Sequence, residues 1–188
     1  MNGKKEQILV SKSKIIEGTF RLLKLYTFDE LTLNEILDEA NISKRTFYRY
    51  FSNKQDILNY YYDDFITNYR SLESEILHQS SLNRVLGVTL DYFYQNRHYL
   101  RLLIKNQKFY LLLEKFNRAA VRIYQSIDAP WHIKAKTPLE LTDSLLFIVG
   151  GYSNIISSWL TEENPRNPQE IAEHINNIFI NVSRNLEL

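Results

Sequence analysis

The stretch from Thr32 to Lys54, TLNEILDEANISKRTFYRYFSNK, decides the fold. Thr32 is an N-cap candidate, and Glu35 follows three residues later, which is the spacing of a capping box. Leu31 and Ile36 flank this start at the two positions of a hydrophobic staple. The stretch therefore opens with a helix whose N-terminus is defined by its own side chains.

A tight turn and a second short helix follow. Asn41 comes directly after the first helix, and asparagine tolerates the left-handed backbone that a helix end needs. Ser43 is the next N-cap candidate and opens a helix of about two turns over residues 44–50. Phe47 and Phe51 lie four residues apart, so both rings should point inward from one face.

The outer side of this second helix combines positive charge with hydroxyl groups and has no carboxylate. Such a helix fits the major groove of DNA, where side chains meet base edges and phosphates. A solvated helix surface is the alternative interpretation of a charge run, but two caps, a turn and paired aromatic residues make this pattern more specific. Ser52 or Asn53 should cap a third helix. The outer residues are Lys44, Arg45, Thr46, Tyr48, Arg49 and Tyr50.

This stretch resembles the N-terminal domain of TetR-type bacterial transcription regulators. The shared pattern is T-x-x-x-I-x-x-x-A-x-[IV]-S-x-x-T-F-Y-x-Y-F-x-x-K-x-x-[IL]-L. Asn41 and Arg45 stand where the family often has glycine. The resemblance implies an all-α fold, with a three-helix DNA-binding head over 9–68 and a helical ligand-binding and dimerisation domain over 69–188. The helix-turn-helix would span about 32–51. The pattern is met by Thr32, Ile36, Ala40, Ile42, Ser43, Thr46, Phe47, Tyr48, Tyr50, Phe51, Lys54, Ile57 and Leu58.

The resemblance and the surface chemistry together suggest two kinds of DNA contact. Residues on the second helix should reach the groove, and residues at helix starts should hold phosphates through hydroxyls, backbone N–H groups and charge. The expected groove residues are Lys44, Arg45, Thr46 and Tyr48, and the expected phosphate residues are Thr32, Ser43, Tyr50 and Lys54.

Composition limits the remaining function classes. The formal net charge of the 188 residues is only +1, so a nucleic-acid surface must come from local patterning. There is no cysteine, which excludes disulfides and thiolate chemistry. The four histidines are scattered without metal-ligand spacing, and no phosphate-loop, dinucleotide or nucleophile-elbow motif occurs. We therefore expect no cofactor, no metal and no enzymatic activity.

Long helices in a cytoplasmic protein are expected, because Gly and Pro are scarce and no apolar run approaches the ~20 residues of a membrane span. The polar N-terminus lacks a signal-peptide core. Residues 1–10 are expected to be a frayed tail or extra turn, or else an arm on DNA. A first helix is predicted over 11–26, and a long connecting helix from 53 to about 79.

Residues 80–127 should form further helices, broken near Asn96 and Asn106. Their aromatic residues recur at helical spacing, which is typical of a core. The alternative is a cavity for a small apolar or aromatic effector. Residues 128–136 are the clear loop, in which Trp131 could pack or lie over a pocket. The candidate cavity residues are Tyr62, Phe93, Tyr99, Phe109, Tyr110, Phe116 and Tyr124.

Two terminal helices are expected to join two copies of the chain. Thr137 and Asn167 each precede a proline and an acidic residue, the arrangement that opens a helix. The run 145–149 is apolar on all sides, so it needs more neighbours than one face provides. Either an intrachain core or a homodimer four-helix bundle satisfies it. The candidate interface is Leu145, Ile148, Tyr152, Ile156, Trp159, Ile175 and Phe179.

Together these observations favour a homodimeric repressor that binds a palindromic operator in double-stranded DNA and is released by a small ligand. A co-regulator whose C-terminal domain binds a protein instead is the second hypothesis. A helical enzyme or purely structural dimer is the third, and it predicts no salt-dependent DNA affinity.

Overall fold

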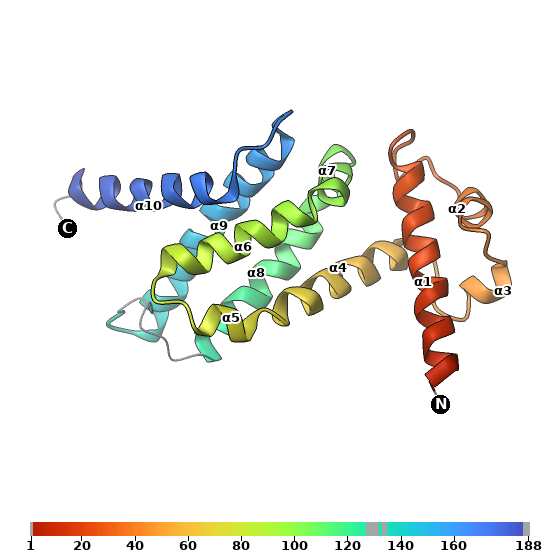
Figure 1. Cartoon of the computed structure of the whole chain (residues 1–188), viewed down its shortest axis with the longest axis horizontal. Helices are drawn as coiled ribbons and strands as arrows, with labels where there is room; N and C mark the ends of the chain where they lie inside the picture. Colours follow the sequence, from red (N-terminus) through yellow and green to blue (C-terminus); the bar gives the residue numbers. More distant parts are fainter. Residues whose placement is uncertain (1, 127–131, 133–134, 186–188) are drawn as a thin grey trace.

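The protein is described from a computed structural model, which covers residues 2–126, 132 and 135–185. Within these ranges the chain forms helices joined by turns, with no strand. A small head lies at one end of an elongated molecule and a larger helical body makes up the rest (Figure 1). The all-α expectation is confirmed.

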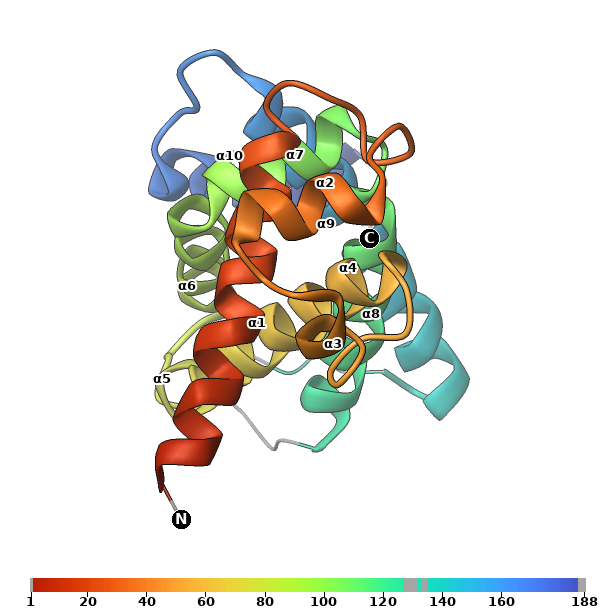
Figure 2. The same ribbon diagram turned by 90° about the vertical axis from the view of Figure 1, so that its right-hand side faces the viewer.

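The head contains α1 (Asn2–Leu22), α2 (Leu33–Ala40) and α3 (Lys44–Phe47). In Figure 2, α1 crosses in front of the body and its N-terminal end projects beyond it. The helix begins well before residue 11, so the backbone of residues 2–10 extends the first helix, which fits the extra turn and not the frayed tail. Gly18 allows the close approach of α2, since a Cβ there would lie 3.1 Å from Ala40 Cβ.

The α2–turn–α3 segment is built by the predicted local chemistry. Thr32 and Glu35 form a complete capping box. Asn41 adopts the left-handed conformation, with φ 52° and ψ 52°, at the end of α2. Ser43 caps α3 by accepting a hydrogen bond of 3.2 Å from the backbone N–H of Thr46. Since these signals are local, each was visible in the sequence.

The connecting helix is shorter than predicted. It divides into α4 (Gln55–Arg70) and α5 (Glu73–Leu77). Ser71 lies at the break, and its hydroxyl donates to the carbonyl of Asn68 at 2.6 Å, so a side chain occupies a terminal helical carbonyl. Just before α4, Asn53 Oδ1 accepts the backbone N–H of Asp56 at 3.2 Å, but the N-cap position is Lys54, one residue later than expected, and its side chain makes no capping bond.

The body contains α6 (Leu82–Gln95), α7 (Arg97–Lys105), α8 (Phe109–Ser126), α9 (Pro138–Thr161) and α10 (Pro168–Asn185). The breaks after α6 and α7 fall where they were predicted. The N–H of Glu140 donates to the Thr137 hydroxyl at 3.1 Å, and that of Gln169 donates to Asn167 Oδ1 at 2.8 Å. Trp131 lies outside the described residues.

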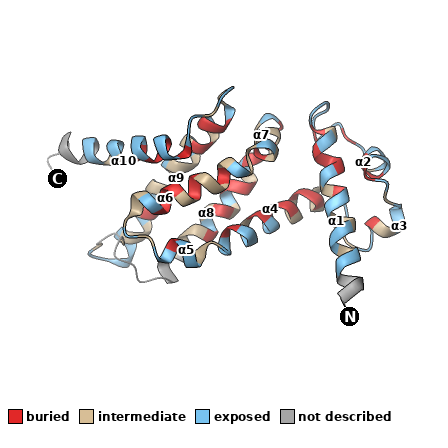
Figure 3. Cartoon of the chain, viewed as in Figure 1, coloured by how far each residue is buried: buried red, intermediate tan, exposed pale blue. Residues whose placement is uncertain are grey.

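One continuous apolar core joins the head to the body, and α4 carries it between them. Figure 3 shows buried residues on α1, α4, α6 and α8, and their side chains belong to one cluster. At the junction the ring of Phe20 stacks on Tyr99, with centroids 4.1 Å apart. The head is therefore packed directly on the body. Among the described residues no helix is long and apolar enough to cross a membrane.

Candidate nucleic-acid interface and interior cavity

Two buried aromatic rings pack α3 against the rest of the head. Phe47 is fully buried and Phe51 is 5% exposed, with their centroids 5.4 Å apart. The opposite side is open, since Lys44 and Arg45 are exposed and the Tyr48 side chain is 58% exposed. The predicted groove residues therefore share one accessible cationic surface, with Thr46 partly covered beside them.

The hydroxyl groups at the helix starts are not equally available to a phosphate. Thr32 donates its hydroxyl to Glu35 Oε2 at 2.7 Å, and its backbone N–H donates to the same oxygen at 2.7 Å. These bonds lower the pKa of Glu35, the backbone bond first. Ser43 and Thr46 share one hydrogen bond of 3.0 Å between their hydroxyls, so one hydroxyl hydrogen of the pair is left for an outside acceptor.

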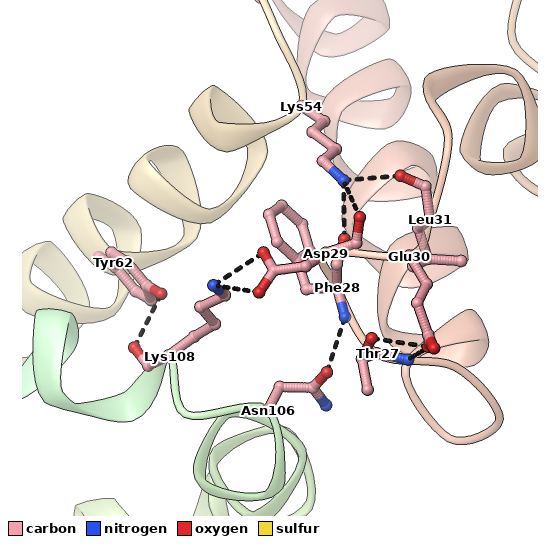
Figure 4. Close-up of polar contacts among 9 residues, drawn as sticks. All are labelled: Thr27, Phe28, Asp29, Glu30, Leu31, Lys54, Tyr62, Asn106 and Lys108. Carbon is pink, nitrogen blue, oxygen red and sulfur yellow. Dashed lines mark hydrogen bonds and ion pairs between the residues drawn. The ribbon is translucent and has the colours of Figure 1, made fainter.

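Lys54 has a structural role that the sequence did not reveal. Its ammonium donates to the carbonyls of Phe28 at 2.9 Å, Asp29 at 3.0 Å and Leu31 at 2.7 Å (Figure 4). An ammonium has three donor hydrogens, and here three carbonyls accept them. Lys54 was expected to bind a phosphate. In the structure its ammonium instead links the start of α4 to the α1–α2 loop.

Arg49 was left out of the predicted contacts although it lies on the same surface. Arg49 is exposed and follows Arg45 by four residues. Residues at this spacing are neighbours on a helical surface, so the two guanidinium groups lie near each other. The guanidinium carbon of Arg49 lies 6.0 Å from the centroid of Tyr50. A shallow groove between α1 and this segment is lined by Glu6, Gln7, Val10, Ser11, Thr46, Arg49 and Tyr50.

The turn between α7 and α8 connects the head to the body. Asn106 is buried, and its Oδ1 accepts the backbone N–H of Phe28 at 2.8 Å. Lys108 forms an ion pair of 2.9 Å with Asp29, while its backbone carbonyl accepts the Tyr62 hydroxyl at 3.0 Å (Figure 4). This turn therefore contacts both the α1–α2 loop and α4.

The body contains an apolar cavity with a volume of about 130 Å³. Residues from α4, α5, α6, α8 and α9 line it, and it is partly open to solvent. Most are aliphatic or aromatic, and none of them is charged. The lining residues are Tyr69, Ile76, Leu82, Val85, Leu86, Thr89, Leu113, Phe116, Asn117, Ala120, Val121, Tyr124, Leu145, Ile148, Val149, Tyr152, Ser153 and Ile156.

Few of the aromatic residues that were predicted to line a cavity do so. Phe116 and Tyr124 line it, but the other five lie elsewhere. Tyr62 and Tyr99 serve the junction with the head, and the Tyr110 side chain is 62% exposed. Phe93 and Phe109 are buried in the core. Aromatic spacing identifies an inward face, but it does not show which rings border an empty space.

The predicted dimer residues lie mainly on the inner face of α9. Leu145, Ile148, Tyr152 and Ile156 line the cavity. Trp159 and Ile175 are buried within the protomer, and Phe179 is partly buried against its core. These side chains therefore serve the core or the cavity of their own protomer, and the dimer interface stays a prediction. A helix that is apolar on all sides gives no sign of which side its own protomer covers. The exposed apolar residues here are Leu139, Leu146, Phe147, Ile178 and Ile180.

Two family profiles match most of the chain. One, described as "Bacterial regulatory proteins, tetR family", matches residues 15–61. The other, described as "Transcriptional regulator C-terminal region", matches residues 80–181, more than half of the chain. The chain belongs to the TetR family. It is therefore a transcriptional regulator with a DNA-binding helix-turn-helix, in a family of regulators rather than enzymes.

Two curated relatives from Bacillus subtilis (strain 168) are similar to this TetR-family chain. The uncharacterized HTH-type transcriptional regulator YvaF is 34% identical over 70 residues, which is 37% of this chain and 36% of the relative. The uncharacterized HTH-type transcriptional regulator YuxN is 26% identical over 151 residues, which is 75% of this chain and 52% of the relative. The matched stretches thus cover about half or less of these relatives.

Solved structures share the fold. A TetR-family transcriptional regulator from Syntrophomonas wolfei has a TM-score of 0.70 at 17% identity, covering 92% of this chain and 94% of that one. A TetR regulator from Streptococcus agalactiae 2603V has a TM-score of 0.63 at 17% identity, covering 93% and 96%. The dihydroxyacetone kinase operon activator DhaS has a TM-score of 0.59 at 15% identity, covering 92% and 95%.

Proposed function

We propose that this TetR-family chain is a cytoplasmic homodimeric repressor that binds a palindromic operator and is released by a small ligand in the body. The observation that carries the DNA-binding part is the exposed cationic side of α3, held outward by the buried rings of Phe47 and Phe51. Lys44, Arg45, Thr46 and Tyr48 are the proposed groove residues, with Arg49 added beside them. Ser43 and Tyr50 remain proposed phosphate contacts.

A second copy of the chain fits the outer faces of α9 and α10. The Phe147 side chain is 77% exposed and that of Ile178 is 51% exposed, although both are large and apolar. Gly150 and Gly151 lie within α9, and a Cβ at either would meet nothing within 4 Å in the protomer. Glycine weakens a helix by about 1 kcal/mol relative to alanine. Close approach of another chain would explain why α9 contains two glycines in spite of this cost. A two-fold dimer matches half-sites ~34–36 Å apart.

The interior cavity favours a small effector over a protein partner as the regulatory signal. If side chains filled the body completely, a small ligand would have no space there, and a protein bound at the surface would be the regulatory signal. Here the space between α6, α8 and α9 is about 130 Å³. Because α9 borders the cavity on one side and carries Phe147 on the other, an occupant can act on the proposed interface.

Selection of bound DNA from a random pool, followed by gel shifts with Arg45→Ala, tests the DNA-binding proposal. The exposed Arg45 guanidinium is placed to read a base edge, so its loss should weaken operator binding by roughly 1–3 kcal/mol and relax base choice at one position. Equal losses on operator and scrambled DNA would remove the base-reading role. Reporter expression with and without the regulator gives the sign of regulation, which matters because DhaS is named an activator.

A further inference from the structure

The interior cavity of the body lies beside a hollow on the molecular surface. This surface hollow has a volume of about 450 Å³ and lies between α6, α9 and α10. It is open to solvent, and its lining is apolar except for one serine. The cavity is likewise lined by uncharged residues and is partly open. The residues that line the surface hollow are Leu82, Ser144, Phe147, Ile148 and Phe179.

Two side chains form the common boundary of the cavity and the surface hollow. Leu82 from α6 and Ile148 from α9 line both spaces. Each of them is only partly buried in a single chain. Whatever fills the surface hollow therefore packs against the same two side chains that an occupant of the cavity contacts.

The edge of the surface hollow favours a second copy of this chain as its occupant. Phe147 borders the hollow, and its side chain is 77% exposed. An exposed ring beside an apolar hollow is self-complementary under two-fold symmetry, because each copy can place its ring in the hollow of the other. Gly150 and Gly151 follow about one turn later on α9, where a Cβ would meet nothing within 4 Å. Another chain can therefore approach α9 closely at this point.

We propose that the second copy of the chain completes the effector cavity. By filling the surface hollow, it holds Leu82 and Ile148 against an occupant of the cavity and excludes water from that side. The lining of the cavity has no charged residue, so the occupant is a small uncharged molecule. The dimer then binds this molecule tightly and a single chain binds it weakly. This inference rests on the proposed function as a dimeric, ligand-responsive regulator.

Ligand binding and dimer formation are then coupled, and this coupling is reciprocal. Covering roughly 55 Å² more of an apolar one-ring ligand corresponds to about tenfold tighter binding. A dimer has two such cavities, so a ligand that gains about tenfold in each should lower the dissociation constant of the dimer about hundredfold. A ligand that enters a cavity already complete in the single chain would change neither quantity.

Cumene, an uncharged hydrocarbon with one ring, is the probe. Sedimentation of the full chain over a range of concentrations, with and without saturating cumene, gives the dissociation constant of the dimer. Calorimetric titration above and below that concentration gives the affinity for cumene. We expect the dimer to tighten about hundredfold and the cumene affinity to be about tenfold higher in the dimer. An unchanged or weakened dimer, equal affinities at the two concentrations, or no uptake of cumene would each overturn the proposal.

Ile178→Arg is the decisive variant, because it places a charge in the proposed interface without changing either lining. The Ile178 side chain is 51% exposed on α10 and lines neither the cavity nor the surface hollow. The variant should keep its helicity, be monomeric and bind cumene about tenfold more weakly at every concentration. Leu25→Arg is the matched control, since Leu25 is 76% exposed in the head, and it should keep the dimer and the affinity. A monomeric Ile178→Arg with full affinity, or a persistent dimer, overturns the proposal.

DNA binding is measured on the same samples, so the two proposals can fail separately. Specific operator binding by a dimer whose cumene affinity does not depend on assembly overturns the shared cavity and leaves the proposed regulator intact. Coupled cumene binding and dimer formation without any specific DNA affinity contradicts the proposed function and leaves the shared cavity.

Discussion

Replacing Lys54 by methionine keeps most of the aliphatic stem and removes the ammonium. In the folded chain this ammonium binds three carbonyls, of which those of Phe28 and Leu31 are partly buried. A buried acceptor that loses its partner costs about 1–3 kcal/mol. The carbonyls of Phe28 and Leu31 are only partly buried, so we count about 1–2 kcal/mol for each, and water can reach that of Asp29. We therefore expect Lys54→Met to lower the free energy of unfolding by about 2–4 kcal/mol.

Thermal and urea unfolding measure this loss directly. For a chain of this length, about 1 kcal/mol corresponds to a shift of roughly 2–4 °C in melting temperature, so the expected decrease is of order 4–16 °C. Lys44→Met is the matched control. Lys44 is exposed on α3, and its side chain makes no hydrogen bond or ion pair among the described contacts, so its replacement should change stability by no more than about 0.5 kcal/mol.

The salt dependence of DNA binding gives the second half of the test. Each phosphate neutralised by a cation contributes about 0.9 to the slope of log affinity against log salt concentration. Lys54→Met should leave that slope unchanged at temperatures where the variant is folded. An unchanged melting temperature together with a slope reduced by about one would show that Lys54 binds phosphate and would refute its role in holding the α1–α2 loop.

Three other changes address the interface, the capping box and the junction. Phe147→Glu removes an exposed apolar ring and should convert the proposed dimer to monomer in sedimentation experiments, with little change in helicity; a persistent dimer contradicts the proposed interface. Hydrogen bonds from Thr32 lower the pKa of Glu35 below its usual 4.5, so its contribution is complete above that pH and is lost as the pH falls through the lowered value. Glu35→Gln should therefore flatten the acid limb of a plot of stability against pH, and an unchanged limb would contradict this. Asn106→Ala leaves the N–H of Phe28 without its acceptor and should cost about 1–3 kcal/mol in urea unfolding; a cost below about 0.5 kcal/mol would show that water replaces the amide.

The parts of the fold that depend on near neighbours could be predicted from the sequence. The caps of α2, α3 and α9 involve residues three positions apart, and the left-handed Asn41 needs only its own short side chain. The inward rings of Phe47 and Phe51 follow from helical spacing, because the pair is four residues apart. These local signals also place the cationic side of α3 outward.

Features set by distant contacts could not be predicted in this way. Lys54 lies 23 to 26 residues after the carbonyls it binds, and no spacing rule relates them. Asn106 looked like a helix break, yet its amide also accepts the N–H of a residue 78 positions earlier. In α9 both faces are apolar, so no sequence pattern distinguishes the side that lines the cavity from the sides that face the core or solvent. Tertiary packing alone decides these roles.

The dependence of the α1–α2 loop on the α7–α8 turn constrains the engineering of chimeric regulators. A hybrid made by grafting this head onto a foreign body at α4 would keep Lys54 but lose Asn106 and Lys108. Such hybrids should be built as a three-part transplant, in which the recipient also receives the short turn that carries these two side chains.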